Sequence, residues 1–222
     1  MSPIRSGTPK LPQKVLRFLE REEGDTLDFK KEVSDSVKIA KTISAFSNKK
    51  GGTLLIGVDD EKRITGINDE EERYIINKAA SEFCKPPVAV LCKTWNIGKK
   101  SILEVQVPEG DLKPYYSLNE DQRWMVYLRY QDETILASKV MVDVLKRRTQ
   151  KANTLFKYSN VEQQLFDHLN KNSQISLKQF TQLAEISSRK ARAILVNLIT
   201  IGAITNQQNN GEEFYILSSV SN

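Results

Sequence analysis

Four carboxylates near the start of the chain have a spacing that could hold a divalent metal ion. Glu23 and Asp28 lie five residues apart, Asp28 within an alternating segment, and Asp59 and Asp60 directly follow an apolar run. Carboxylates at neighbouring strand ends can bind Mg²⁺ or Mn²⁺, which would polarise a phosphate and activate water. These residues also have a structural interpretation, because Lys30 shares a strand face with Asp28 and can neutralise it, and aspartate is common in turns after strands.

A second group of residues could contact phosphate groups. Lysines gather in one stretch of the chain, at Lys30, Lys31, Lys38, Lys41, Lys49 and Lys50. Further along, Arg129 and Tyr127 share one face of a predicted strand, and a guanidinium beside an aromatic ring suits stacking or phosphate contact. An arginine buried against a core carboxylate is an equally good interpretation of Arg129. Asp132 and Glu133, which follow it, would repel phosphate.

The composition narrows the classes of protein. The chain has 222 residues and a formal net charge of +5, which suits a phosphate-rich partner without requiring one. No apolar run approaches the ~20 residues that span a bilayer, and residues 1–10 lack the apolar core of a signal peptide. We therefore expect a cytoplasmic protein without membrane contact. A single histidine, His168, leaves little room for histidine-based catalysis, and Cys84 and Cys92 lack metal-site spacing.

The apolar spacing predicts the elements that would position these residues. Helical patterns occur at residues 11–23, between Ser36 and Gly51, and at 69–84 and 137–148, and strand-like runs occur at 26–30, 53–58, 63–66, 88–95, 101–107 and 124–130. Ser36 and Asp69 are the expected N-caps of two helices. The run at 53–58 predicts a central strand covered on both faces. Because helices and strands mix without βαβ repetition, we expect an α+β domain with a mixed sheet.

The segment from Glu23 to Gly66 resembles a known domain family. Its motifs are Glu23-Gly24-Asp25-Thr26-Leu27-Asp28-Phe29-Lys30, Ala45-Phe46-Ser47-Asn48, a Gly51-Gly52 turn before the apolar strand, and Ile64-Thr65-Gly66. They resemble the AlbA_2 domain, a module associated with nucleic-acid binding in bacterial regulators and in the core of Schlafen proteins. The resemblance covers roughly residues 12 to 148 and includes an arginine in a late strand, here Arg129.

The resemblance implies two possible activities. In nuclease-active Schlafen proteins, three carboxylates coordinate a divalent cation that cuts RNA; Glu23 and Asp28 match the first two positions, and Asp59 or Asp60 matches the third. The family usually has glutamate where Asp28 stands, and aspartate is one methylene shorter, which would disturb a tight octahedral site. Many bacterial relatives are described as DNA-binding instead.

The end of the chain resembles a second family. Predicted helices follow Ser176 and Ser187, and residues 203–206 and 214–217 form a predicted hairpin. Helix, helix–turn–helix and hairpin in that order resemble the winged helix-turn-helix domains that bind DNA. On the third helix, Ala191, Ile194, Leu195 and Leu198 form the apolar face, whereas Arg189, Ala193 and Val196 point away, flanked by Lys190, Arg192 and Asn197. The resemblance implies that this outer face enters the major groove.

Together these observations predict a DNA-binding transcriptional regulator with no resident cofactor. We expect a flexible leader at residues 1–11, an AlbA_2-like domain at 12–148, a linker at 149–159 and a small winged helix-turn-helix domain at 160–222. Duplex DNA is the expected partner, and dimerisation is expected because paired half-sites multiply affinity. The predicted contacts are Arg189, Lys190, Arg192 and Asn197 in the second domain, and Lys30, Lys38, Lys41, Lys49, Lys50 and Arg129 in the first. The alternative is an endoribonuclease acting on structured RNA, with Glu23, Asp28, Asp59 and Asp60 as the catalytic carboxylates and Mg²⁺ or Mn²⁺ held by Glu23, Asp28 and Asp59.

Overall fold

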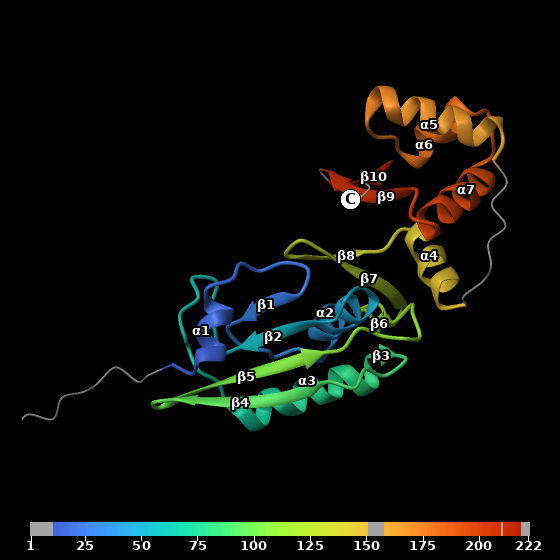
Figure 1. Ribbon diagram of the computed structural model, residues 1–222. Coiled ribbons are helices and arrows are strands. Elements are labelled where there is room, and N and C mark those ends of the chain that lie inside the picture. Colours follow the sequence, from blue (N-terminus) through green and yellow to red (C-terminus); the bar gives the residue numbers. More distant parts are fainter. Residues whose placement is uncertain (1–10, 151–157, 210, 219–222) are drawn as a thin grey trace, which may run out of the picture. The chain divides into compact units, whose positions relative to one another are not determined.

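The computed structural model describes residues 11–150, 158–209 and 211–218. The chain divides into two compact units, Met1–Leu136 and Ala137–Asn222 (Figure 1). Residues 1–10 of the predicted leader and 151–157 of the predicted linker lie outside the described residues, whereas Thr149 ends a helix and Ser159 caps the next one. The boundary between the units lies before the helix that we expected to close the first domain, so that helix belongs with the C-terminal elements.

The first unit contains a mixed sheet, as the α+β prediction requires. Its strand order is β1 (Leu27–Lys30), β2 (Gly52–Ile56), β5 (Lys100–Val107) and β4 (Leu91–Ile97) (Figure 1). The first two strands are parallel, and the remaining pairs are antiparallel. A second, antiparallel sheet has the order β3 (Cys84–Lys85), β6 (Tyr116–Leu118), β7 (Trp124–Tyr130) and β8 (Glu133–Leu136).

Strand β2 is covered on both faces, as its apolar run predicts. Leu54 and Ile56 belong to a core with helices α2 (Ser36–Asn48) and α3 (Asp69–Glu82). Leu55, on the opposite face, belongs to a second core with helix α1 (Gln13–Leu19). The alternation follows from the two-residue period of a strand, which sends successive side chains to opposite faces.

Several local predictions for the first unit were wrong in detail. Helix α2 is capped by Asp35 rather than Ser36: Asp35 Oδ1 accepts from the backbone N–H of Val37 at 2.8 Å. Helix α3 begins after Asn68 rather than being capped by Asp69. The expected strand at 63–66 is a single bridge between Val58 and Ile64. Strands β3, β6 and β8 were not predicted, because two to four residues are too few to show a period.

The second unit consists of four helices and a hairpin. They are α4 (Lys139–Thr149), α5 (Asn160–Asn172), α6 (Leu177–Leu183), α7 (Ser188–Thr200), β9 (Ile204–Asn209) and β10 (Glu212–Leu217). Ser176 and Ser187 cap α6 and α7, as predicted. The side chains of Leu165, Phe180, Leu195 and Tyr215 are fully buried. Helix α4 packs against α7.

Within the described part of the chain, no helix combines the length and the apolar character needed to cross a membrane.

Candidate nucleic-acid interface

The first turn of α7 presents two exposed cations. Ser187 caps the helix by accepting from the backbone N–H of Lys190 at 3.3 Å, and Arg189 and Lys190 are both exposed. The segment before the cap is tight: Glu185 has a left-handed φ of +52°, and Ile186 N donates to Thr181 O at 3.1 Å. A helix start carries partial positive charge, so these cations reinforce its attraction for an anion.

The predicted inner face of α7 is confirmed, but its predicted outer face is only partly right. Ala191, Ile194, Leu195 and Leu198 are buried as expected. Val196, which we expected to be exposed, is only 5% exposed. The reason is α4, whose residues line a groove together with Ala193 and Val196. Periodicity on α7 alone could not reveal this second covering helix.

Helix α4 also binds two of the polar residues that we expected to contact DNA. Arg192 Nε lies 3.2 Å from Asp143 Oδ2, and the guanidinium of Arg147 donates to the side-chain oxygen of Asn197. Arg148 donates to the carbonyl of Ile199 at 3.2 Å. Arg192 and Asn197 are therefore engaged inside the unit.

The groove between α4 and α7 is rich in cations. It encloses about 350 Å³ and is lined by Asp143, Lys146, Arg147, Gln150, Arg189, Arg192, Ala193 and Val196. Four of these residues are Lys or Arg, and Asp143 is the one carboxylate among the described residues that line it. We had not predicted a role for Lys146 and Arg147, although the run Lys146-Arg147-Arg148 at the end of a helix was a visible signal.

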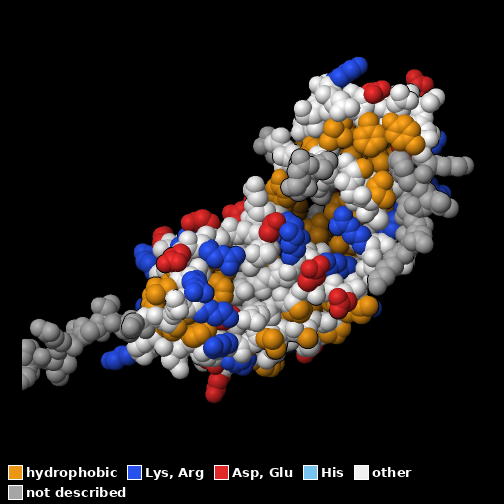
Figure 2. Space-filling model, viewed as in Figure 1, with side chains coloured by type: hydrophobic (Ala, Val, Ile, Leu, Met, Phe, Trp, Pro, Cys, Tyr) orange, Lys and Arg blue, Asp and Glu red, His pale blue; other side chains and the backbone are white. Residues whose placement is uncertain are grey.

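The lysines predicted to form a basic surface on the first unit do not form one patch. Lys38 lies in the first turn of α2 and Lys50 lies beyond its last residue, Asn48, so about 15 Å of helix separates them at 1.5 Å per residue. Lys41 pairs with Glu120 at 2.8 Å, Lys49 with Asp25 at 2.6 Å and Lys30 with Asp28 at 2.7 Å. On the face in Figure 2, basic side chains over this unit are interspersed with acidic and apolar ones.

Arg129 is buried, which confirms the alternative of a core ion pair and excludes a phosphate contact. Its side chain is only 2% exposed, and Nη2 lies 3.4 Å from Asp28 Oδ1. The guanidinium also donates to the carbonyl of Gly24 at 3.1 Å and to Thr134 Oγ1 at 3.2 Å. These contacts connect β7 and β8 with the start of β1. The prediction of Arg129 as a DNA-binding residue was wrong, because a buried side chain cannot reach a ligand.

The four carboxylates do not fit a metal centre. Asp28 is only 2% exposed and is paired with Arg129 and Lys30. Strand β1, which we expected to be half-buried, is therefore buried on both faces. Glu23 accepts from the backbone N–H of Phe29 at 2.6 Å, and Asp59 pairs with Arg63 at 2.8 Å. Arg63 and the backbone lower the pKa of Asp59. Among the described residues, no three His, Cys, Asp or Glu side chains gather closely enough to hold a metal ion.

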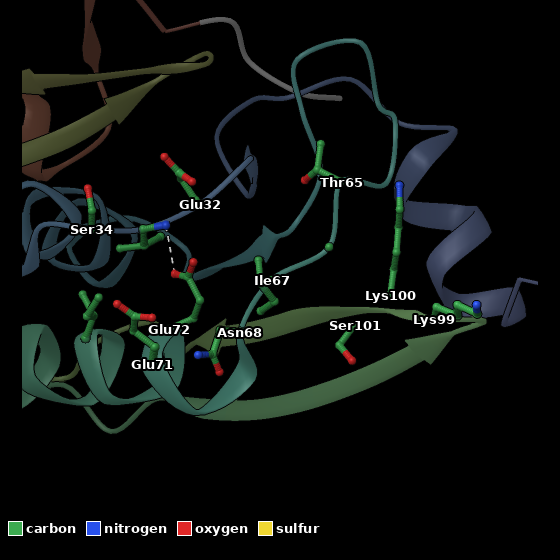
Figure 3. Close-up of a pocket in the computed structure, with 13 residues that line it drawn as sticks. Glu32, Ser34, Thr65, Ile67, Asn68, Glu71, Glu72, Lys99, Lys100 and Ser101 are labelled. Carbon is green, nitrogen blue, oxygen red and sulfur yellow. Dashed lines mark hydrogen bonds between the residues drawn. The ribbon is translucent and has the colours of Figure 1, made fainter.

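A separate hollow of about 630 Å³ lies near the ends of β1 and β2 (Figure 3). Glu32, Glu71 and Glu72 line one side of it, and Lys99 and Lys100 line the other (Figure 3). Glu72 accepts from the backbone N–H of Val33 at 2.8 Å, and burial raises the pKa of its carboxyl group, helped by the neighbouring Glu32 and Glu71. Three carboxylates on one wall would repel phosphate, so we do not assign this hollow to the candidate nucleic-acid interface.

Several solved structures resemble parts of this chain, among them the following two. The DIP2311 protein from Corynebacterium diphtheriae is 15% identical, with a TM-score of 0.44, over 61% of this chain and 32% of that protein. The N-terminal domain of a Nitrosomonas europaea protein, described as related to the ATP-dependent DNA helicase RecG, is 27% identical, with a TM-score of 0.40, over 48% of this chain and 81% of that domain. This chain thus spans about a third of the DIP2311 protein.

Among curated proteins, none matches this chain. A family model described as "Schlafen, AlbA_2" matches residues 23–138. The matched region begins at the first acidic residue of the Glu23–Gly66 motifs and ends just before α4, where the first compact unit also ends. Since the match spans more than half of the 222 residues, the chain belongs to the Schlafen AlbA_2 family.

Proposed function

We propose that this chain is a duplex-DNA-binding protein of the transcriptional-regulator type. In this proposal α5, α6, α7 and the β9–β10 hairpin form a winged helix-turn-helix domain, and α7 carries the DNA contact. Membership of a family associated with nucleic-acid binding supports the proposed partner. The order of elements in the second unit supports the proposed domain.

One observation supports this function most strongly. The first turn of α7 follows a tight turn, is capped by Ser187, and exposes Arg189 and Lys190 at the positive end of the helix. Two cations at a helix start are well placed for phosphate oxygens. We propose that the first unit does not provide a basic surface of its own, since most of its predicted contact lysines are paired with carboxylates. We propose instead that it serves in homo-oligomerisation, which would place two α7 helices on one duplex.

The test is binding of the purified chain to a fluorescently labelled duplex of about 30 base pairs, followed by anisotropy. We expect binding in EDTA that weakens as salt rises, since each phosphate contact releases counterions. Arg189→Ala should weaken binding about tenfold, which corresponds to about 1.4 kcal/mol. Lys171→Ala is the matched control, because it removes an exposed cation from the end of α5 in the same unit.

The same samples distinguish the alternative function. Labelled structured RNA is incubated with Mn²⁺ or with EDTA and separated on a denaturing gel. RNA cutting that needs Mn²⁺ and is lost in Glu23→Gln would replace the regulator proposal with an endoribonuclease. Absence of duplex binding by the unaltered chain would refute the regulator proposal directly.

A further inference from the structure

Helix α4 limits how α7 can bind nucleic acid. It lies along the face of α7 that contains Arg192, Ala193 and Val196, which is the face that a winged helix would insert into the major groove. A helix with its side chains is about 10–12 Å wide, and packed helix axes lie about 8–10 Å apart. The pair is therefore about 20 Å across, whereas the major groove is about 12 Å wide. With α4 in place, α7 cannot enter the groove along this face.

The residues that would read bases are already bound by α4. Asn197 accepts from Arg147, and Arg192 is paired with Asp143 at 3.2 Å. An asparagine or arginine reads a base edge through a bidentate pair of hydrogen bonds, which needs its polar atoms to be free. Val196, whose methyl groups could have met a thymine, is buried. Three features of base reading on α7 are thus removed by one neighbouring helix.

What remains on this surface suits phosphate. Lys146 and Arg189 are exposed at the groove, and Arg147 and Arg192 each use part of a guanidinium and keep further N–H groups for a ligand. Four cations against one carboxylate leave the groove strongly positive. Two of the cations come from α4 and two from α7, so either helix alone would present only half of the cations.

We propose that α4 and α7 together form a binding groove for the phosphodiester backbone of duplex DNA, and that the contact is independent of base sequence. This inference rests on the proposed function and makes it narrower, because it assigns Lys146 and Arg147 of α4 to the interface. A small phosphorylated molecule presents the same phosphate oxygens as the DNA backbone, so the test also measures competition by a mononucleotide.

The decisive variant is Lys146→Ala, because Lys146 is exposed and contributes to the groove from α4. Binding of two labelled duplexes of unrelated sequence is measured over a series of salt concentrations, with Arg189→Ala and Lys171→Ala in parallel. We expect Lys146→Ala to weaken both duplexes equally, by several-fold. The slope of log affinity against log salt should fall by about 0.9 for each phosphate contact removed. Unchanged thermal unfolding would establish that the variant is folded.

Four outcomes would overturn the inference. If Arg189→Ala weakens binding and Lys146→Ala does not, α4 is no part of the interface and the proposed function alone survives. If one duplex binds a hundredfold more tightly than the other, bases are read and α4 must leave α7. If a mononucleotide competes with duplex at equal ionic strength and comparable concentration, the groove serves a small phosphorylated ligand. Absence of duplex binding by the unaltered chain would refute both this inference and the proposed function.

Discussion

The buried pair of Asp28 and Arg129 provides the sharpest test of the first unit. Asp28→Asn keeps the size of the side chain but removes the negative charge opposite Arg129. Arginine stays protonated in proteins, and the Arg129 side chain is only 2% exposed, so an uncompensated charge would remain in the core. Breaking a buried pair in this way costs about 3–5 kcal/mol, out of a typical total stability of about 5–15 kcal/mol.

The assay is urea unfolding followed by tryptophan fluorescence. Both tryptophans, Trp95 and Trp124, belong to the first unit, so the signal reports on that unit alone. With a urea dependence of about 2 kcal/mol per molar, the loss predicts a midpoint lower by about 2 M. The double variant Asp28→Asn with Arg129→Met should recover a large part of the loss. Replacement of a buried pair is often nearly neutral, and Arg129 Nε has no hydrogen-bond partner among the described residues.

Two results would refute this reasoning. A midpoint shift under about 0.5 M for Asp28→Asn would mean that Arg129 does not depend on this carboxylate. A double variant as unstable as the sum of the single variants would mean that the two side chains are not coupled. If Asp28→Asn instead leaves stability unchanged and abolishes RNA cutting, Asp28 would be a functional ligand rather than a structural partner.

Two further changes test the first unit. Gly51→Ala should destabilise this unit by about 1–3 kcal/mol or more in the same urea assay. Gly51 has a φ of +71°, and a Cβ at this position would lie 2.6 Å from the carbonyl oxygen of Val107. An unfolding midpoint equal to that of the unaltered chain would contradict this expectation. Glu72→Gln should raise the melting temperature at pH 7–8. The pKa of Glu72 is raised by burial, so its ionisation opposes folding above that pKa, and the advantage of Gln should shrink as pH falls towards the ordinary value of 4.5. A difference between Glu72→Gln and the unaltered chain that does not change with pH would count against a buried, ionised Glu72.

Much of the local structure could be predicted from the sequence. The apolar run before Asp59 predicted a strand covered on both faces, and Ser176 and Ser187 predicted two helix starts. Such features depend on residues that are close in the chain, because capping and periodicity act within one or two turns or along one strand. The motifs between Glu23 and Gly66 were likewise enough to predict the family to which the chain belongs.

The partners of buried and charged residues could not be predicted in this way. Asp28 and Arg129 are 101 positions apart, and only the packing of β7 and β8 near β1 brings them together. Lysines that are close together in the sequence are spread out along α2 in the fold, because each helical residue adds 1.5 Å along the helix axis.

The sequence by itself determined most of the helices and the longer strands, the inner apolar face of α7, and the positions of the cations along each helix. Only the tertiary structure decided what covers those faces. Helical periodicity showed that one face of α7 is buried, yet it contained no record of α4, which covers Val196 and binds Arg192 and Asn197. The physical reason is that helical periodicity shows only which face of a helix is apolar, whereas the packing between segments far apart in the sequence depends on the whole chain. The backbone-binding pair that we propose, in place of a groove-reading helix, therefore rests on the fold and not on the sequence pattern.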